Sequence, residues 1–83
     1  MSSDWYVYIV RCSDHSLYTG IATDVEARLR QHNAGNGARY TRSRLPVVLV
    51  YREPAADRSA ASRREYAIKQ MTAVDKRRLV QGH

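Results

Sequence analysis

Several residue types are scarce in this 83-residue chain, which has one cysteine, two prolines and no phenylalanine. Cys12 alone cannot form an internal disulfide or a cysteine-based zinc site, and a reducing cytoplasm is its natural setting. We expect no signal sequence, because an acidic residue and a strand already stand at Asp4 and Trp5. No apolar run approaches the roughly 20 residues of a membrane-spanning helix. These absences favour a soluble, cytoplasmic protein.

The chain is also short of acidic residues and lysine. Eight Asp and Glu stand against fourteen Lys and Arg, a net charge of +6, and only Lys69 and Lys76 are lysines. Such a balance favours a polyanionic partner such as nucleic acid, and arginine suits phosphate because its planar guanidinium binds with two hydrogen bonds. A high genomic GC content would produce the same arginine bias. The length predicts a single domain, which we place at residues 4–80.

The first third of the chain predicts a β-hairpin. Residues 5–10 are apolar or aromatic, as in a strand that is central in its sheet and covered on both faces. Residues 13–16 form a turn cluster and residues 17–22 a second strand. Gly20 within that strand predicts a bulge or a close backbone approach.

A helix follows the hairpin. Thr23 and Glu26 match a capping box, and Gly35 suits the end of the helix. One helical face carries two apolar residues for the core and two polar residues, Arg28 and His32, which we expect at the border between core and solvent.

The remaining elements complete an α+β fold. We predict a surface loop at residues 36–44, a buried third strand at 47–51, a helix at 58–70 and a terminal helix at 74–80 capped by Thr72. The expected fold is a small, three-stranded, mainly antiparallel sheet flanked by helices, in the order ββαβαα.

Glu65 is unusual in the second long helix, because it shares a face with Ala61 and Ile68 while Lys69 points elsewhere. A carboxylate among apolar neighbours needs a cation, hydrogen bonds or a metal ion.

Five short motifs, taken in order, resemble the GIY-YIG nuclease superfamily and above all its small stand-alone bacterial members. The resemblance spans roughly residues 5–79. The motifs are Tyr6-Val7-Tyr8, Tyr18-Thr19-Gly20, Arg28, Gln31-His32-Asn33 and Arg64-Glu65-Tyr66.

The resemblance implies a metal-dependent endonuclease, with possible settings in DNA repair or processing. It gives Tyr8 a part in proton transfer, Tyr18 the orientation of water or phosphate, and Arg28 the stabilisation of charge on the phosphoryl oxygens. His32 matches a histidine of some members and would act as acid, base or phosphate ligand, while Glu65 would hold one Mg²⁺ or Mn²⁺. We expect a nucleic-acid partner, DNA in preference to RNA. The arginine-rich loop around Tyr40 would bind it through Arg39, Tyr40, Arg42 and Arg44.

The sequence departs from the family at two positions. Tyr6 stands where the first motif usually has glycine, and no asparagine follows Glu65. The second departure leaves open a weakened activity, or a site completed by another group or a partner chain. Each residue also has a purely structural interpretation: tyrosines that pack, a histidine at a helix border, and a salt bridge from Glu65 to an arginine such as Arg28.

The hairpin offers a geometric test of a shared site. Strand side chains alternate, so Tyr8 and Tyr18 share a face only if paired residue numbers sum to an even value. A three-residue turn or a bulge would give that pairing, whereas a two- or four-residue turn would place the tyrosines on opposite faces. Besides the nuclease, two hypotheses remain: a non-catalytic nucleic-acid-binding module, and a subunit activated by a protein partner.

Overall fold

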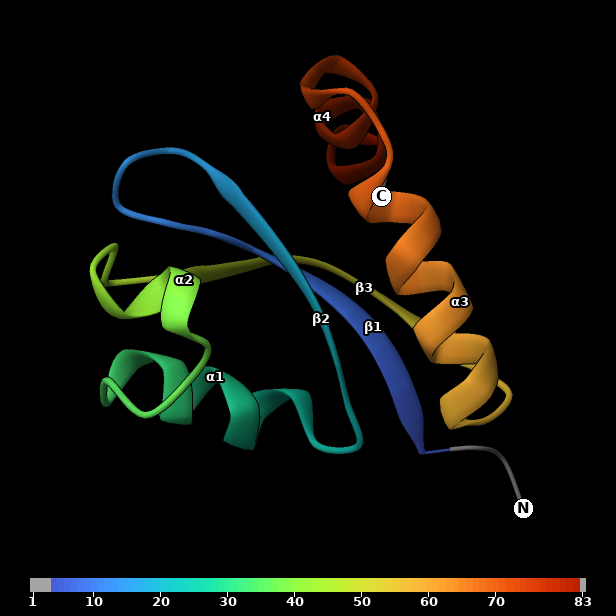
Figure 1. Ribbon diagram of the computed structural model, residues 1–83, viewed down its shortest axis with the longest axis horizontal. Helices are drawn as coiled ribbons and strands as arrows, with labels where there is room; N and C mark the ends of the chain where they lie inside the picture. The colour runs from blue at the N-terminus through green and yellow to red at the C-terminus, as the bar shows by residue number, and fades with distance from the viewer. Residues whose placement is uncertain (1–3, 83) are drawn as a thin grey trace.

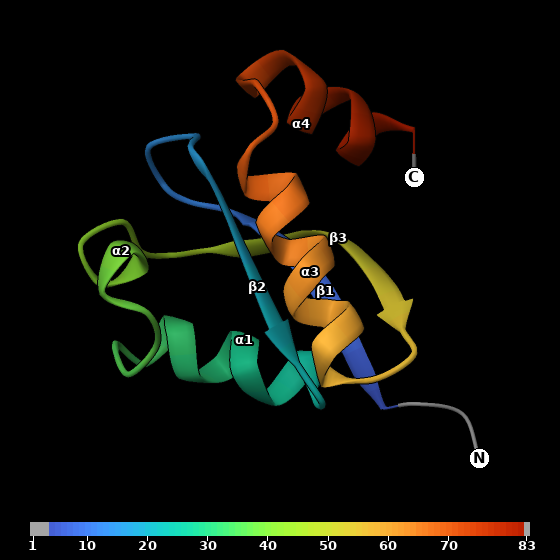
Figure 2. The same cartoon turned by 45° about the vertical axis from the view of Figure 1, so that its right-hand side comes forward.

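The protein, described here by a computed structural model over residues 4–82, is a three-stranded antiparallel sheet flanked by helices. Helices α1 and α2 lie on one side of the sheet and α3 and α4 on the other (Figure 1, Figure 2). The predicted fold class is therefore confirmed, with one short helix added. In chain order the elements are β1 (Trp5–Arg11), β2 (Leu17–Ala22), α1 (Val25–Asn33), α2 (Arg39–Arg42), β3 (Val48–Ala55), α3 (Arg58–Lys69) and α4 (Ala73–Gln81).

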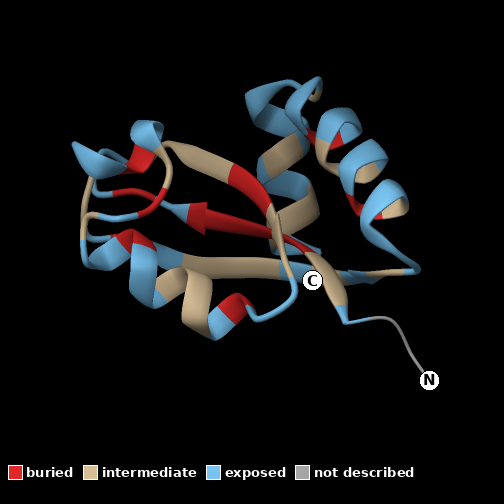
Figure 3. Ribbon diagram, turned by 60° about the horizontal axis from the view of Figure 1, so that its bottom comes forward, coloured by how far each residue is buried: buried red, intermediate tan, exposed pale blue. Residues whose placement is uncertain are grey.

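The central strand is β1, as predicted, because the strand order is β2-β1-β3. Its side chains point alternately into two buried clusters, so β1 runs through the middle of the core (Figure 3). The cluster on the α1 side contains Tyr8, Val10, Cys12, Val25 and Val47, and the cluster on the α3 side contains Val7, Ile9, Ala61 and Ile68.

The hairpin register places the two motif tyrosines on the same face of the sheet. Tyr8 pairs with Gly20 and Val10 pairs with Tyr18, so paired numbers sum to an even value throughout. The Cys12 amide donates to the Ser16 carbonyl at 2.8 Å, which leaves a turn of three residues. The shared face that the candidate site requires is therefore present, and the three-residue turn provides it.

Gly20 makes a close approach but no bulge. Pairing between β1 and β2 is uninterrupted, and the irregularity in the sheet lies between Ile9 and Val10, opposite β3. A Cβ atom on Gly20 would lie 2.6 Å from Tyr8 Oη and 2.7 Å from Tyr8 Cζ. The residue must be glycine because the ring of Tyr8 crosses β2 at this point.

The start of α1 differs from the predicted capping box. Asp24, not Thr23, is the N-cap, and its carboxylate accepts from the Ala27 amide at 3.0 Å. Glu26 does not reach back to the cap, because it pairs with Arg52 of β3 at 2.7 Å. The adjacent threonine and aspartate can both cap a helix, and here the aspartate carboxylate does so. The end is close to the prediction, since Gly35 follows α1 with a left-handed φ of 83°.

Two further predictions are corrected in the middle of the chain. The expected loop at residues 36–44 contains α2, a single turn too short to show a periodic pattern. The expected strand at 47–51 begins one residue later and continues to Ala55. It is an edge strand that is only partly buried, with Val48 49% exposed, and an edge position tolerates Pro54.

The two C-terminal helices match their predicted positions to within one residue. Asp57 caps α3 through the Ala60 amide, and Thr72 caps α4 through the Asp75 amide as predicted. Across residues 4–82, none of the helices has the length and apolar character needed to cross a membrane.

Candidate active site

A chain of buried hydrogen bonds begins at the Tyr8 hydroxyl. Tyr8 Oη lies 2.8 Å from His32 Nε2, and His32 Nδ1 lies 2.8 Å from Thr41 Oγ1. The Thr41 hydroxyl donates its only proton to the Ala38 carbonyl at 2.9 Å, so its oxygen must accept from Nδ1–H. A neutral His32 therefore offers the lone pair of Nε2 to the Tyr8 O–H group.

This chain is more deeply buried than the sequence indicated. Tyr8 is 2% exposed and His32 and Thr41 are 0% exposed, so the prediction that His32 lies at a border is wrong. The segment between α1 and α2 covers the histidine, and a Cβ atom on Gly37 would lie 2.8 Å from His32 Cα. Thr41 and Gly37 carried no signal in the sequence, because their role depends on how this segment folds back on α1.

Burial shifts both ionisable groups towards their neutral forms. It raises the pKa of Tyr8, although the neighbouring Arg28 guanidinium partly opposes this shift. Burial also lowers the pKa of His32, and the charge of Arg28 lowers it further. Around neutral pH the pair is therefore an uncharged phenol donating to an uncharged imidazole.

Arg28 and Tyr18 lie close to this pair. Arg28 is half-buried on α1, and its Nη1 donates to Gln31 Oε1 at 2.9 Å. The ring of Tyr18 stands edge-on to the ring of His32, with centroids 5.6 Å apart. Tyr18 and the Glu65 carboxylate both lie near enough to Tyr8 to add to the rise in its pKa.

Glu65 pairs with Lys69 and not with an arginine. The two charged groups are 3.2 Å apart, and the Lys69 ammonium also lies 5.6 Å from the centre of the Tyr18 ring. The prediction that Lys69 points away from Glu65 is therefore wrong. The i, i+4 spacing of the two residues is the signal that could have revealed their pairing.

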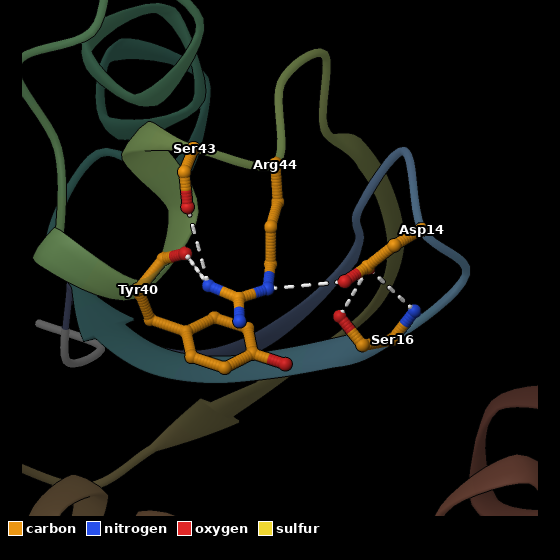
Figure 4. A network of polar contacts seen from close by, with 5 residues as sticks. All are labelled: Asp14, Ser16, Tyr40, Ser43 and Arg44. Carbon is orange, nitrogen blue, oxygen red and sulfur yellow. Dashed lines mark hydrogen bonds and ion pairs between the residues drawn. The ribbon is translucent and has the colours of Figure 1, made fainter.

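The arginine-rich segment is partly engaged within the protein. Arg44 pairs with Asp14 at 3.0 Å, donates to the Tyr40 carbonyl at 2.7 Å and lies over the Tyr40 ring (Figure 4). Arg42 Nε donates to the Gly37 carbonyl at 3.4 Å, while Arg39 is exposed. The Tyr40 ring stacks on Tyr18 with centroids 5.9 Å apart, which joins this segment to the site.

The donor set suits a metal ion bound mainly by substrate and water. Within residues 4–82 no group of three or more His, Cys, Asp or Glu side chains could enclose a metal ion. Mg²⁺ requires no such cage, because it keeps several waters and uses one or two carboxylates together with substrate phosphates. Glu65, 23% exposed and beside the Tyr8 pair, fits that role once Lys69 gives way to the metal ion.

The fold and the site together define a class of protein. It is a small α+β domain in which a tyrosine, a histidine, an arginine and a glutamate lie close together, with the tyrosine ring against β2. The model of the GIY-YIG catalytic domain matches residues 4–78, and the chain belongs to this family, a nuclease superfamily.

Relatives and solved structures agree with that membership. The chain is 60% identical over 79 residues to UPF0213 protein DP2720 of Desulfotalea psychrophila, covering 94% of this chain and 72% of that protein. It is 55% identical over 76 residues to UPF0213 protein SH2523 of Staphylococcus haemolyticus, covering 92% of this chain and 93% of that protein. The solution structure of UPF0213 protein BH0048 from Bacillus halodurans is similar with a TM-score of 0.60 and 43% identity, covering 93% of this chain and 82% of that one. The GIY-YIG domain thus accounts for most of this chain, and the chain matches most of the length of these UPF0213 relatives.

Proposed function

We propose that the protein is a metal-dependent endonuclease that hydrolyses phosphodiester bonds in nucleic acid, DNA in preference to RNA. The buried hydrogen-bond chain from Tyr8 through His32 to Thr41, placed beside Arg28, carries this proposal. It provides a path for the proton that an attacking water must lose.

In the proposed reaction the phenol of Tyr8 relays a proton. As the water oxygen bonds to phosphorus, Tyr8 Oη accepts a proton from the water and passes its own proton to His32 Nε2. The bond from phosphorus to the leaving oxygen breaks, and that oxygen is protonated from solvent. The imidazolium that forms keeps its Nδ1–H bond to Thr41. No free phenolate is needed, which suits a tyrosine whose pKa is raised.

The other residues act on charge and position. Arg28 is a permanent cation that would stabilise the negative charge growing on the phosphoryl oxygens. Tyr18, beside His32, would orient the water or the phosphate. A Mg²⁺ or Mn²⁺ ion held by Glu65 supplies further neutralisation of phosphate charge when bound.

The charge of the protein supports the proposed substrate, and its free cysteine supports the proposed cellular compartment. The net charge of +6 and the exposed Arg39 and Tyr40 favour a nucleic-acid substrate. Cys12 is free and buried, in keeping with a reducing cytoplasm. DNA repair or processing is the role that we attach to such an activity, with residues 4–80 acting as one domain.

Cleavage of single-stranded, duplex and branched DNA, and of matching RNA, with Mg²⁺ or Mn²⁺ and with chelator tests the proposal. We expect cleavage only with the metal ion, and a loss of about 10²-fold or more in Tyr8→Phe, where the proton path is cut. Arg28→Ala and Glu65→Ala should lose a comparable amount. Tyr66→Phe is the matched control, since this tyrosine is 68% exposed and outside the site.

Cleavage that persists undiminished in all three site variants would show that a contaminant, not this protein, cuts the DNA. Resistance of every substrate to the wild-type protein would instead favour the second candidate below.

The second candidate function is nucleic-acid binding without cleavage. Two observations favour it: Tyr8 is only 2% exposed, and the Glu65 carboxylate is occupied by Lys69. Salt-dependent binding of DNA by the wild type without cleavage at any metal concentration would support this function. Co-purification with a protein partner that restores cleavage would place the protein as an activated subunit.

A further inference from the structure

Three adjoining hollows extend from Tyr18 towards the C-terminal helix. The first, of about 340 Å³, is lined by Tyr18, Tyr40, Lys69 and Lys76, among others. The second, of about 240 Å³, shares Lys76 with the first, and the third, of about 330 Å³, shares Arg77 with the second. All three have Leu17 in their lining, so they lie side by side between the hairpin and α4, and we call this row of hollows the basic groove.

The lining of the basic groove carries positive charge and no negative charge. Its basic residues are Arg11, His15, Lys69, Lys76 and Arg77, and none of its lining residues is Asp or Glu. Lys69 is paired with Glu65, but in the described part of the chain no ion pair joins Arg11, Lys76 or Arg77 to a carboxylate. Uncompensated cations in a concave surface attract and concentrate anions.

The hairpin side of the basic groove is held in place by the rest of the fold. Asp14 in the turn is paired with Arg44, which is itself fixed over Tyr40 (Figure 4). The Ser13 amide also donates to the Arg44 carbonyl at 2.9 Å. His15 follows in the left-handed region with φ of 68° and lines the groove. The turn therefore forms a fixed wall opposite α4.

We propose that the basic groove binds the sugar-phosphate backbone of an unpaired nucleic-acid strand running outward from the active site. The proposal rests on the nucleic-acid substrate of the proposed function. Tyr18 and Tyr40 stack on each other at the inner end, next to the active site. The cations beyond them can follow a sugar-phosphate backbone, as the positively charged grooves that bind single strands do. The hollows are small, about 240 to 340 Å³ each, so we expect a single strand rather than a duplex to enter them.

Binding of fluorescent oligonucleotides without divalent cation tests this groove. The test variant is Lys76→Ala/Arg77→Ala, and the control is Arg30→Ala/Arg63→Ala, which removes the same charge from exposed positions outside the groove. For a single strand we expect the test variant to lower the slope of log Kobs against log salt by about 1.4, corresponding to two phosphate contacts. The control should keep the wild-type slope, and binding of a blunt duplex should not distinguish the two variants.

Thermal unfolding of both variants establishes that they are folded, and Lys76→Gln/Arg77→Gln repeats the test with different side chains. The groove proposal would be contradicted if the test and control variants had equal salt slopes on a single strand. It would also be contradicted if the test variant lost as much slope on a blunt duplex as on a single strand. The test requires no cleavage. If the groove variant lowers the salt slope but the wild-type protein never cleaves DNA, only the nuclease proposal is rejected. If the wild-type protein cleaves DNA but the groove variant keeps the wild-type salt slope, only the groove proposal is rejected.

Discussion

At the scale of single residues, the candidate site depends on one absent side chain. The Tyr8 hydroxyl reaches His32 because Gly20 leaves room for the ring across β2. The pattern Tyr-Thr-Gly marked this glycine as unusual, but the sequence could not show that a side chain, rather than backbone, approaches it. The bond from Tyr8 to His32 spans 24 positions along the chain, and nothing local in the sequence encodes its partner Thr41.

Gly20→Ala should destabilise the protein, because its Cβ atom would meet Tyr8 Oη at 2.6 Å. Forcing a methyl group into a packed core costs about 1 to 3 kcal/mol, which urea unfolding measures. In a Tyr8→Leu background the atoms in the way are gone, so the same substitution should become neutral or stabilising, as alanine normally is in a strand. An unchanged penalty in that background would contradict the contact.

His32 makes stability depend on pH. Because burial lowers its folded pKa below the ordinary value of 6.5, the unfolded chain binds more protons between these two pKa values. The free energy of unfolding should therefore be fully retained above about pH 6.5 and fall as the pH drops towards the folded pKa. The slope is at most about 1.4 kcal/mol per pH unit for one proton.

Urea unfolding from pH 8 to pH 5 measures this dependence. His15→Gln is the matched control, since His15 is exposed in the turn, and this variant should keep the wild-type slope. A stability that stays flat below pH 6.5, or a slope that disappears in His15→Gln, would contradict the assignment to His32.

At the scale of elements, patterns that repeat along the chain were predictable and single-turn features were not. The apolar run of β1 indicated a central strand. The rule that paired residue numbers with an even sum place Tyr8 and Tyr18 on one face also describes the observed hairpin. The short α2 has no periodicity to detect. Residues 52–55 join β3 although they include two charged residues and a proline, because an edge strand needs only backbone pairing with β1. The pairing of Glu65 with Lys69 was predictable from their i, i+4 spacing, because residues four apart lie next to each other on a helix.

The start of α1 can be tested by removing each possible cap. Asp24→Ala should cost about 0.5 to 2 kcal/mol, because it leaves the Ala27 amide without its acceptor. Thr23→Ala should cost less, since the threonine hydroxyl does not cap this helix. Denaturant unfolding of the two variants decides between them, and the reverse ranking would favour the capping box that the sequence predicted.

At the scale of the whole molecule, the two faces of the sheet have different contents. The face towards α1 holds the buried polar chain of Tyr8, His32 and Thr41, while the face towards α3 is an apolar cluster around Val7 and Ile9. Because β1 contributes alternate residues to both faces, the apolar cluster supports the strand that carries Tyr8. Stability and activity should therefore be separable by substitutions on opposite faces.

Ile68→Val, on the apolar face, should lower stability without changing the site. Ile68 is fully buried, so removing one methylene group costs about 0.5 to 1.5 kcal/mol. For a domain of this size each kcal/mol lowers the Tm by about 4 to 8 °C. At a temperature where the variant is still folded, its rate of DNA cleavage, or its DNA affinity if no cleavage is found, should equal that of the wild type. Val74→Ala, which shortens an exposed side chain of α4, is the control and should leave both properties unchanged. A loss of function in folded Ile68→Val would show that the two faces are coupled through β1.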